Sequence, residues 1–332
     1  MAVLVTGGAG YIGGHMVLAL LDAGEEVVVL DDLSTGFAWA VPTAATLVVG
    51  DAGDAARLSA ILAEHRIDSI AHFAAKIVVP DSVADPLGYY FSNTVKTRAL
   101  VEFAVRNGIR NFIFSSTAAV YGEPAANPIF ETAQPAPINP YGRSKLMVEW
   151  MLGDAAKAHD LSYVALRYFN VAGADPKGRL GQSTPNATHL IKVAVQAALG
   201  LRPGMDVYGT DYPTPDGTCV RDYIQVSDLI AAHLLALEHL RAGGESLVLN
   251  CGYGHGHSVR EVIEVVKEVS GTDFEVRLTG RRAGDPAALV AGAQLIRSRM
   301  GWTPRYDDLR EIVRQAYEWE RKLRDGTVPK AR

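Results

Sequence analysis

Short apolar runs and amphipathic stretches alternate along the first half of the chain. Runs rich in valine, leucine, isoleucine and phenylalanine predict buried strands, and apolar residues three and four apart predict helices between them. Strands are predicted over residues 3–5, 27–30, 47–49, 69–74, 111–116 and 163–168. Strands that alternate with helices are typical of a parallel sheet that is covered by helices on both faces.

Two pairs of a capping residue and a proline mark helix starts, because Asp and Asn cap helices and proline is favoured at the first helical position. Asp85-Pro86 opens a helix that is predicted to end near Gly108, and Asn139-Pro140 opens a second one. One face of the first helix holds Leu87, Tyr90, Phe91 and Thr94. Residues 121–140 contain five prolines and are predicted to form a long loop, a kind of segment that often carries function.

Beyond residue 170 the pattern changes to glycine- and proline-rich loops that separate single helices. Helices are predicted over residues 190–199, 227–240, 258–269 and 309–323, and Glu261 completes a capping box with Ser258. We therefore expect two domains. Residues 1–170 carry the parallel sheet, and residues 171–332 form a smaller mixed α/β domain over the carboxyl ends of the strands, with segments that can return to the first domain.

The first predicted strand runs directly into the sequence G-G-A-G-Y-I-G at residues 7–13. Gly7 and Gly10 allow a tight turn close to a pyrophosphate, and Gly13 allows the next helix to pack on the strand. The second strand ends in Asp31, whose carboxylate suits a ribose with free hydroxyls and repels a 2′-phosphate. The pattern predicts a Rossmann-type doubly wound parallel sheet that binds NAD rather than NADP.

Composition narrows the possible partners. The chain has 332 residues and a net charge of −5, which argues against nucleic-acid binding. Its two cysteines, Cys219 and Cys251, are too few for a disulfide framework or a zinc site, and we expect no metal. The first strand leaves no room for a signal peptide, and no apolar run is long enough to span a bilayer. These features predict a soluble cytoplasmic protein.

Tyr141 and Lys145 are candidate catalytic residues because they lie four apart on a predicted helix and so share one face. A tyrosine with an ordinary pKa of about 10 is a poor base at neutral pH, and a nearby ammonium group favours its phenolate. Thr117 follows the strand at 111–116 and offers a hydroxyl at the same rim. The spacing Y-x-x-x-K is common by chance, and the alternative is an exposed helix pair without function.

Several motifs carry a resemblance. S-S-T-A-A-V-Y-G at 115–122, Y-G-R-S-K at 141–145 and R-Y-F-N at 167–170 resemble the extended short-chain dehydrogenase/reductase family. D-Y-P-T-P-D-G-T-C-V-R-D-Y-I at 211–224 and R-R-A-G-D at 281–285 are similar to one branch of it, the UDP-glucose 4-epimerases. The resemblance implies interconversion of UDP-glucose and UDP-galactose through a transient 4-keto sugar, by a homodimer with tightly held NAD and with Thr117, Tyr141 and Lys145 as catalytic residues.

The resemblance also implies two sets of binding residues. The cofactor set consists of Gly7, Gly10, Tyr11, Ile12, Gly13, Asp31, Asp51, Ala52, Phe73, Ala74, Ala75, Asn93, Ser115, Tyr141, Lys145 and Tyr168. The substrate set consists of Thr117, Tyr141, Asn170, Leu190, Tyr208, Arg221, Arg282, Asp285 and Leu289. In this set the two arginines and Asn170 match diphosphate contacts, Leu190 and Tyr208 match the uracil pocket, and Leu289 matches the position that lines the hexose pocket.

The chain also departs from the family pattern. Ala118 and Ala119 follow Thr117 where dehydratases carry acidic residues, which argues against elimination chemistry. Lys192 stands where a proline is frequent, Lys76 precedes a position that is often lysine, and Cys219 replaces a glycine of some relatives. The alternatives that stay open are a 4-epimerase of a UDP-N-acetylhexosamine, a UDP-pentose or a UDP-uronate, and a nucleotide sensor without catalytic activity.

Overall fold

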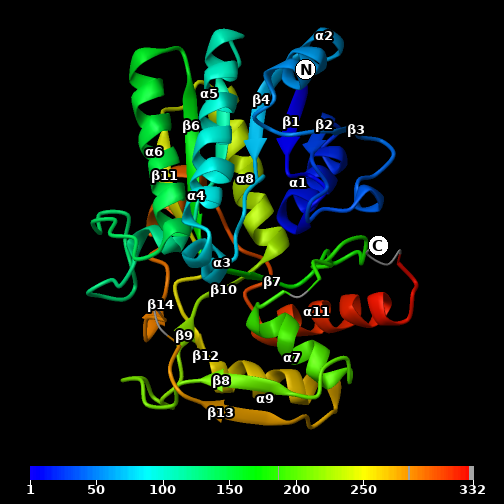
Figure 1. The fold of residues 1–332 in the computed structure, drawn as a ribbon, viewed down its shortest axis with the longest axis vertical. Helices are drawn as coiled ribbons and strands as arrows, with labels where there is room; N and C mark the ends of the chain where they lie inside the picture. The colour runs from blue at the N-terminus through cyan, green and yellow to red at the C-terminus, as the bar shows by residue number, and fades with distance from the viewer. Residues whose placement is uncertain (186, 283–284, 329–332) are drawn as a thin grey trace.

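The centre of the molecule is a parallel sheet of seven strands, in the order β11-β6-β5-β4-β1-β2-β3 (Figure 1). The computed structural model describes residues 1–185, 187–282 and 285–328. The sheet consists of β1 (Ala2–Thr6), β2 (Glu26–Asp31), β3 (Thr46–Val49), β4 (Ile67–His72), β5 (Asn111–Ser115), β6 (Ser162–Tyr168) and β11 (Leu247–Cys251). The predicted doubly wound parallel sheet is thus confirmed, and the six strands predicted from the sequence all belong to it.

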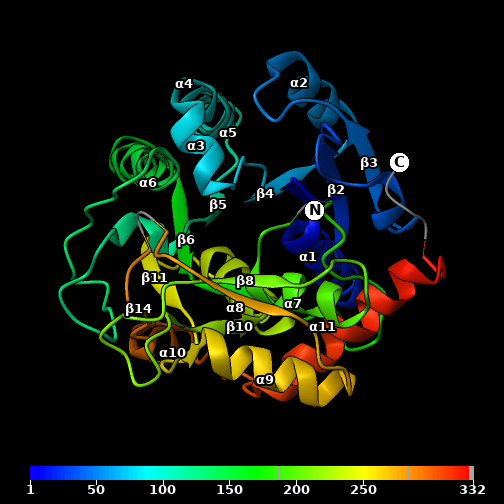
Figure 2. The ribbon, with the colours of Figure 1, turned by 60° about the horizontal axis from the view of Figure 1, so that its bottom comes forward.

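Helices cover both faces of this sheet, as Figure 2 shows from below. Val3 and Val5 of β1 join one core cluster, whereas Leu4 joins the cluster on the opposite face, as the two-residue period of a strand requires. One face is covered by α1 (Tyr11–Asp22) and α8 (Val226–Arg241), and the other by α2 (Ala55–Glu64), α5 (Lys96–Arg106) and α6 (Pro140–Ala158).

The region between β4 and α5 corrects one prediction. A single helix was expected from Pro86 to Gly108, but the chain forms α3 (Val79–Ala84), α4 (Pro86–Tyr89), a π-helical segment (Tyr90–Val95) and then α5. Such a segment changes the direction of side chains relative to a regular helix, and here it accompanies a buried Asn93. Leu87 and Phe91 of the expected face are exposed.

The second half of the chain forms a smaller layer below the carboxyl ends of the strands (Figure 1). Its helices are α7 (Leu190–Ala198), α9 (Val259–Ser270) and α11 (Leu309–Arg324), whereas α10 (Gln294–Met300) packs against α8 and β11 of the large sheet. This layer also contains three small sheets. Two of them have two strands each: β7 (Asn170–Ala172) pairs with β10 (Tyr223–Gln225), and β8 (Met205–Tyr208) pairs with β13 (Val276–Thr279). The third has three strands, in which β9 (Val220–Arg221) lies between β12 (His257–Ser258) and β14 (Ala288–Leu289).

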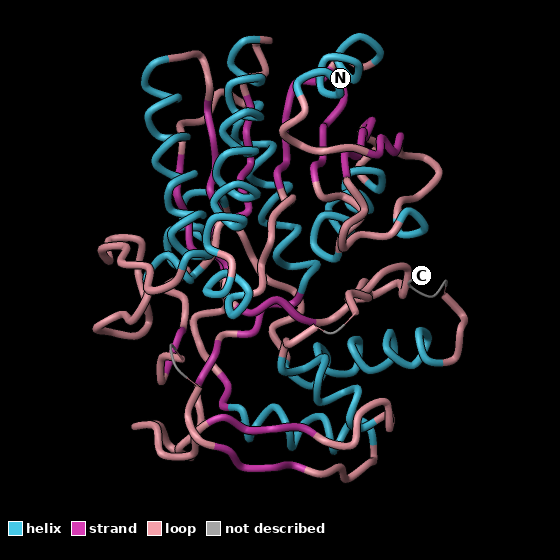
Figure 3. Tube along the Cα trace, viewed as in Figure 1, coloured by secondary structure: helices cyan, strands magenta, loops and turns pink. Residues whose placement is uncertain are grey.

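The chain crosses between the two layers more than once. After β10, α8 and β11 return to the large sheet, so a boundary at residue 170 separates the layers only in the first part of the sequence. Ser258 caps α9 through the expected capping box with Glu261. Long stretches of loop join the elements near the carboxyl ends of the strands (Figure 3). Among the described residues, no helix is both long and apolar enough to cross a membrane.

Candidate active site

The turn between β1 and α1 requires glycine at two positions. Gly7 has φ +75°, and a Cβ there would lie 2.6 Å from the backbone nitrogen of Ala74. A Cβ on Gly13 would lie 2.2 Å from the carbonyl oxygen of Gly7. The turn is closed by Gly7 N, which donates to Leu30 O at 2.9 Å, and by Gly10 N, which donates to Gly7 O at 3.2 Å. The backbone therefore passes close to the strand ends without side chains in the way.

The start of α1 fits a dinucleotide pyrophosphate. In the described part of the chain no side chain caps this helix, whose N-cap is Gly10, so its first N–H groups remain available for phosphate oxygens. Tyr11 and Ile12 in the first turn are half-buried, and the Tyr11 hydroxyl donates to Gly173 O at 2.8 Å. This contact joins the cofactor side of the molecule to the segment after β7.

Asp31 lies at the end of β2 and is buried. Its carboxylate accepts from Ala9 N at 2.9 Å and from Leu33 N at 2.8 Å. Leu33 has φ 58°, an unusual conformation for leucine that the second hydrogen bond holds in place. Burial raises the pKa of the Asp31 carboxyl above its ordinary value. Asp31 thus also fixes the glycine turn through Ala9, a role that sequence reasoning missed.

Two further residues of the predicted cofactor set make backbone contacts. Asp51 accepts from Gly53 N at 2.8 Å and forms an ion pair with Lys96, beside the half-buried Ala52. Asn93 accepts from Lys76 N at 2.8 Å and donates to Lys76 O at 2.9 Å. The Asn93 side chain therefore fixes the segment after β4, and these two backbone hydrogen bonds explain why a polar side chain is buried there.

Phe73, Ala74 and Ala75 follow β4 directly and are half-buried at the rim of the sheet beside the glycine turn. The Phe73 ring lies 5.0 Å from the ring of His233 in α8. The preceding residue, His72, bonds Thr6 at 2.6 Å through Nδ1 and Thr97 at 2.8 Å through Nε2. Burial, and then the charge of Lys145, lower the pKa of His72 to about 3. His72 is therefore neutral and links three elements; its only sequence signal was its place at a strand end.

Tyr141, Lys145 and Thr117 come together where β5 ends beside α6. Lys145 Nζ donates to the carbonyl oxygen of Ser115 at 2.9 Å and lies 4.9 Å from the centre of the Phe114 ring. Burial raises the pKa of the Tyr141 hydroxyl, and a hydrogen bond with the Thr117 side chain opposes that rise. Burial lowers the pKa of the Lys145 ammonium to about 7. The group thus consists of a buried phenol with a hydroxyl partner, and an ammonium one helical turn away.

Ser115 and Tyr168 form a second contact at this edge, with their hydroxyl oxygens 2.5 Å apart. Burial raises the pKa of the Tyr168 hydroxyl, and so does the neighbouring Tyr141. Ser115 thus uses its carbonyl oxygen for Lys145 and its side chain for β6. The ends of β5 and β6 are thereby joined beside the catalytic candidates.

On the substrate side, Arg221 and Leu289 are brought together as register partners of β9 and β14. Leu289 is half-buried and packs against the apolar cluster that contains Ala118, the residue after Thr117. Asp222 was missed by sequence reasoning. Its buried carboxylate accepts from three backbone N–H groups, those of Tyr253, Gly254 and Ala291, and so fixes the strand that carries Arg221.

Arg282 and Asp285 form a two-pronged ion pair, with Nε to Oδ2 at 3.0 Å and Nη2 to Oδ1 at 3.1 Å. The Arg282 guanidinium also lies 5.3 Å from the centre of the Tyr208 ring, a distance typical of a cation–π contact. These three predicted substrate residues therefore form one surface cluster. Residues 283–284 of the R-R-A-G-D motif lie outside the described residues.

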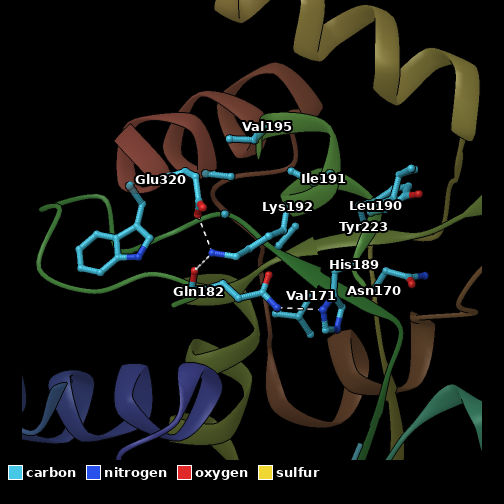
Figure 4. A pocket seen from close by; sticks show the side chains of 14 residues that line it. Asn170, Val171, Gln182, His189, Leu190, Ile191, Lys192, Val195, Tyr223 and Glu320 are labelled. Atoms are coloured by element: carbon cyan, nitrogen blue, oxygen red, sulfur yellow. Dashed lines mark hydrogen bonds and ion pairs between the residues drawn. The ribbon is translucent and has the colours of Figure 1, made fainter. Parts of the chain in front are cut away.

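Asn170 and Leu190 line a small cavity between β7 and α7 (Figure 4). Asn170 lies against β9–β10, and its Nδ2 donates to Asp222 O at 3.4 Å. Figure 4 also shows Lys192, which donates to Gln182 O at 2.6 Å and to Glu320 at 2.5 Å. The Lys192 side chain, whose family position is often proline, therefore takes part in a buried network that lines the cavity.

Comparisons with known proteins agree with this architecture over nearly the whole chain. The model of the NAD dependent epimerase/dehydratase family matches residues 3–252. A UDP-glucose 4-epimerase from Azospirillum brasilense is 59% identical over 321 residues, which are 97% of this chain and 92% of that protein.

Two solved structures have the same fold. The UDP-glucose 4-epimerase from Brucella ovis, solved in complex with NAD, gives a TM-score of 0.93 at 46% identity, over 96% of this chain and 97% of that one. The UDP-Glc/GlcNAc 4-epimerase of Campylobacter jejuni gives 0.85 at 48% identity, over 97% and 99%. The family resemblance seen in the motifs is thus confirmed, and the chain belongs to the NAD dependent epimerase/dehydratase family.

Proposed function

We propose that this protein is an NAD-dependent UDP-glucose 4-epimerase, which interconverts UDP-glucose and UDP-galactose through a transient 4-keto sugar. The observation that carries the proposal is the meeting of Tyr141, Lys145 and Thr117 at the end of β5, beside a glycine turn that fits a dinucleotide. The relatives with that printed activity match 96–97% of the chain, and the family is NAD dependent.

When it is bound, NAD supplies the acceptor and donor of the hydride at sugar C4. Tyr141 accepts the proton of the C4 hydroxyl and returns it after the 4-keto sugar has turned over in the site. Because burial raises the pKa of its hydroxyl, Tyr141 needs a neighbour that favours the phenolate. The Lys145 ammonium serves this purpose, and the Thr117 hydroxyl donates a hydrogen bond to the same oxygen or to the C4 oxygen.

The substrate diphosphate needs fixed positive charge, for which arginine is well suited because its planar fork donates two hydrogen bonds at once. We assign this task to Arg221 and Arg282, with Asn170 as a further donor. Asp285 orients Arg282. Leu190 and Tyr208 contact the uracil, and Leu289 lines the hexose pocket. The cofactor roles stay with the sixteen residues named from the sequence, from the glycine turn to Tyr168.

The decisive experiment is a UDP-sugar panel with no cofactor added. We expect the purified protein to contain NAD and to interconvert UDP-glucose and UDP-galactose without net formation of NADH, because each turnover reduces and reoxidises the same cofactor. NADH that accumulates in proportion to product would identify a dehydrogenase instead. A dehydrated product would contradict the interpretation of Ala118 and Ala119, neither of which can transfer a proton.

We also propose that two copies associate. Leu87, Phe91 and Val95, which follow one another at four-residue spacing, expose 78%, 59% and 49% of their surface, and Trp150 of the adjacent α6 exposes 61%. Exposed apolar side chains gathered on neighbouring helices are typical of an interface. Sedimentation equilibrium should give a dimer, and Phe91→Glu should give a monomer; a monomeric parent protein would contradict the proposal.

We propose a cytoplasmic location because neither cysteine forms a disulfide. Cys219 and Cys251 are both free and buried, as is usual for proteins of a reducing compartment. Fractionation of the source cells followed by an activity assay tests this location.

A further inference from the structure

Ser116 follows the last residue of β5, and each of its two neighbours in the chain contacts a catalytic candidate on α6. Ser115 before it accepts from Lys145 through its carbonyl oxygen, and Thr117 after it contacts Tyr141. Ser116 itself is fully buried, and its hydroxyl donates to Oε1 of Glu149 at 2.5 Å. One side chain thus connects the middle of this three-residue segment to α6.

Glu149 lies on the same helix as both catalytic candidates. It follows Lys145 by four residues and Tyr141 by eight, so all three side chains project from one face of α6. The hydrogen bond between Ser116 and Glu149 therefore joins the segment 115–117 to the helix face that carries Tyr141 and Lys145. A slip of that segment along the helix would break this bond together with the Lys145 and Tyr141 contacts.

Glu149 is itself held in place from β6. Arg167 donates to its Oε1 through Nε at 3.0 Å and to its Oε2 through Nη2 at 2.6 Å, and both side chains are almost wholly buried. Arg167 also donates to the Tyr121 hydroxyl at 2.9 Å, and that hydroxyl donates to Asn250 at 2.7 Å. Arg167 thus fixes the Glu149 carboxylate directly, and Tyr121 and Asn250 in turn hold Arg167 in place.

We propose that Ser116 and Glu149 are positioning residues for the 4-epimerase reaction: their hydrogen bond keeps the end of β5 in register with α6, so that Thr117 meets Tyr141 and the Ser115 carbonyl meets Lys145. The proposal rests on the function proposed above. Ser116 belongs to the motif at 115–122, but neither Ser116 nor Glu149 is among the catalytic or binding residues named from the sequence. The role of the pair is inferred from its position between the two catalytic contacts.

The charge of Glu149 has a second effect on the site. The titratable and charged groups that face it are Lys145 on its own helix and Arg167 and Tyr163 on β6. Tyr121, on the turn after β5, bonds Arg167. Lys145 also faces His72 on β4, which is neutral. Glu149 raises the pKa of Lys145 and so opposes the effect of burial. It therefore favours the protonated ammonium that Tyr141 requires.

The first test is Ser116→Ala, which removes one hydroxyl and leaves the ion pair intact. We expect kcat to fall by about 10²-fold, because a small misplacement of reacting groups can slow a reaction by that factor. The KM for UDP-glucose and the amount of bound NAD should change little. Ser69→Ala is the matched control, since Ser69 is also fully buried but lies near the start of β4, at the opposite end of the sheet. Equal kcat values for the two variants would overturn the proposal.

The second test does not need catalysis. The Tyr141 pKa is measured by following tyrosinate absorbance as a function of pH, after subtraction of the same titration of the protein that also carries Tyr141→Phe. We expect Ser116→Ala to raise that pKa, because Thr117 and Lys145 lose their register with Tyr141. An unchanged Tyr141 pKa would overturn the positioning role, whether or not the protein has 4-epimerase activity. A raised Tyr141 pKa in a protein without epimerase activity would overturn only the proposed function.

Glu149→Gln separates charge from position. Glutamine keeps an oxygen that accepts from Ser116, but the loss of charge lowers the pKa of Lys145, so the alkaline limb of the kcat profile should move to lower pH. Restoring the charge with Glu149→Asp should move the limb back toward its original position. An alkaline limb that is the same in the parent protein and in Glu149→Gln would contradict this electrostatic part of the proposal.

Discussion

Lys192 of α7 and Glu320 of α11 form an ion pair with 2.5 Å between Nζ and Oε2, although 128 residues separate them in the sequence. Only 5% and 6% of the two side chains are exposed. Removing one partner of a buried pair leaves the other charge without compensation, which costs about 3–5 kcal/mol. Lys192→Met should therefore lower the free energy of unfolding by about that amount, measured by urea denaturation.

Lys157→Met is the control for that measurement. Lys157 pairs with Asp154 at 3.5 Å, but both side chains are about four-fifths exposed, and such pairs contribute little to stability. The double variant Lys192→Met with Glu320→Leu removes both charges and should recover most of the lost stability. If Lys192→Met and Lys157→Met unfolded at the same urea concentration, the buried pair would have no special role.

Tyr141→Phe should lower kcat by about 10²–10⁴-fold, the usual effect of losing one acid–base group, because the ring stays in place and only the proton acceptor is lost. The bound NAD and the fold should be unchanged. Tyr163→Phe is a suitable control, since Tyr163 is also a buried tyrosine but lies near the start of β6. Near-normal kcat in Tyr141→Phe would mean that another residue is the base.

The sequence predicted the regular parts of the fold because each depends on local signals. The glycine turn, the strand that ends in Asp31 and the cap and proline that open α6 were each visible in a signal only a few residues long. The π-helical segment at Tyr90–Val95 had no such signal, since its direction depends on contacts such as that of Asn93 with Ser144, 51 residues away.

The sequence also predicted the candidate catalytic residues but not the contacts that hold them in place. Spacing alone placed Tyr141 and Lys145 on one face of a helix, but the partner of Lys145 is a backbone oxygen 30 residues earlier. The burial of Lys192 could not be foreseen, because its counter-charge lies in the last helix. Sequence identifies the residues that the chemistry needs, whereas the residues that hold them are fixed by contacts between distant parts of the chain.

Lys145 should make stability depend on pH. Its pKa is about 7 in the folded protein and 10.5 for the free side chain, so between these values the unfolded chain binds a proton that the folded one has lost. The contribution of this residue to the free energy of unfolding therefore increases as pH rises from about 7 to 10.5. Urea denaturation of NAD-free protein at several pH values should show a smaller increase for Lys145→Met than for the parent protein.

The same variant also tests catalysis. Without the ammonium the Tyr141 phenolate is less favoured, so the acid limb of the kcat profile should move to higher pH. A profile that stays in place would show that Lys145 does not act on Tyr141. The denaturation result is independent of this outcome, because it needs neither substrate nor cofactor.

Asp31→Asn tests the choice between NAD and NADP. The variant loses the charge that repels a 2′-phosphate, and it keeps only one oxygen for the two N–H groups of Ala9 and Leu33. Hydrogen bonds to charged groups contribute about 1.5–3 kcal/mol, so NADH should bind about tenfold more weakly or worse, while discrimination against NADPH should decrease. Fluorescence titration with both cofactors measures this, with Glu26→Gln at the exposed end of β2 as control. Unchanged discrimination would exclude a role of Asp31 at the ribose.

Leu289 should limit the size of the sugar that the enzyme accepts. It lies opposite Arg221 in β14 and packs toward the turn after Thr117, between the proposed diphosphate and catalytic groups. In the family that this chain resembles, a bulky tyrosine at this position accompanies plain hexoses and a small residue accompanies N-acetylated sugars, and leucine is intermediate in size. Rejection of an acetamido group by apolar bulk contributes only about 1–3 kcal/mol, so UDP-N-acetylglucosamine should be a weak substrate beside UDP-glucose.

Two substitutions at this position test the prediction in opposite directions. Leu289→Tyr should abolish turnover of UDP-N-acetylglucosamine, and Leu289→Ser should increase it, with little change toward UDP-glucose in either variant. Because the discrimination is worth about 1–3 kcal/mol, the ratio of the two kcat/KM values should change by about 10–200-fold. Leu278→Ser, at an exposed leucine of β13, is the control for lost apolar surface. If the ratio stayed constant in both variants, Leu289 would serve only to pack β14 against the turn at Ala118, and the sugar pocket would have to be bounded by other residues.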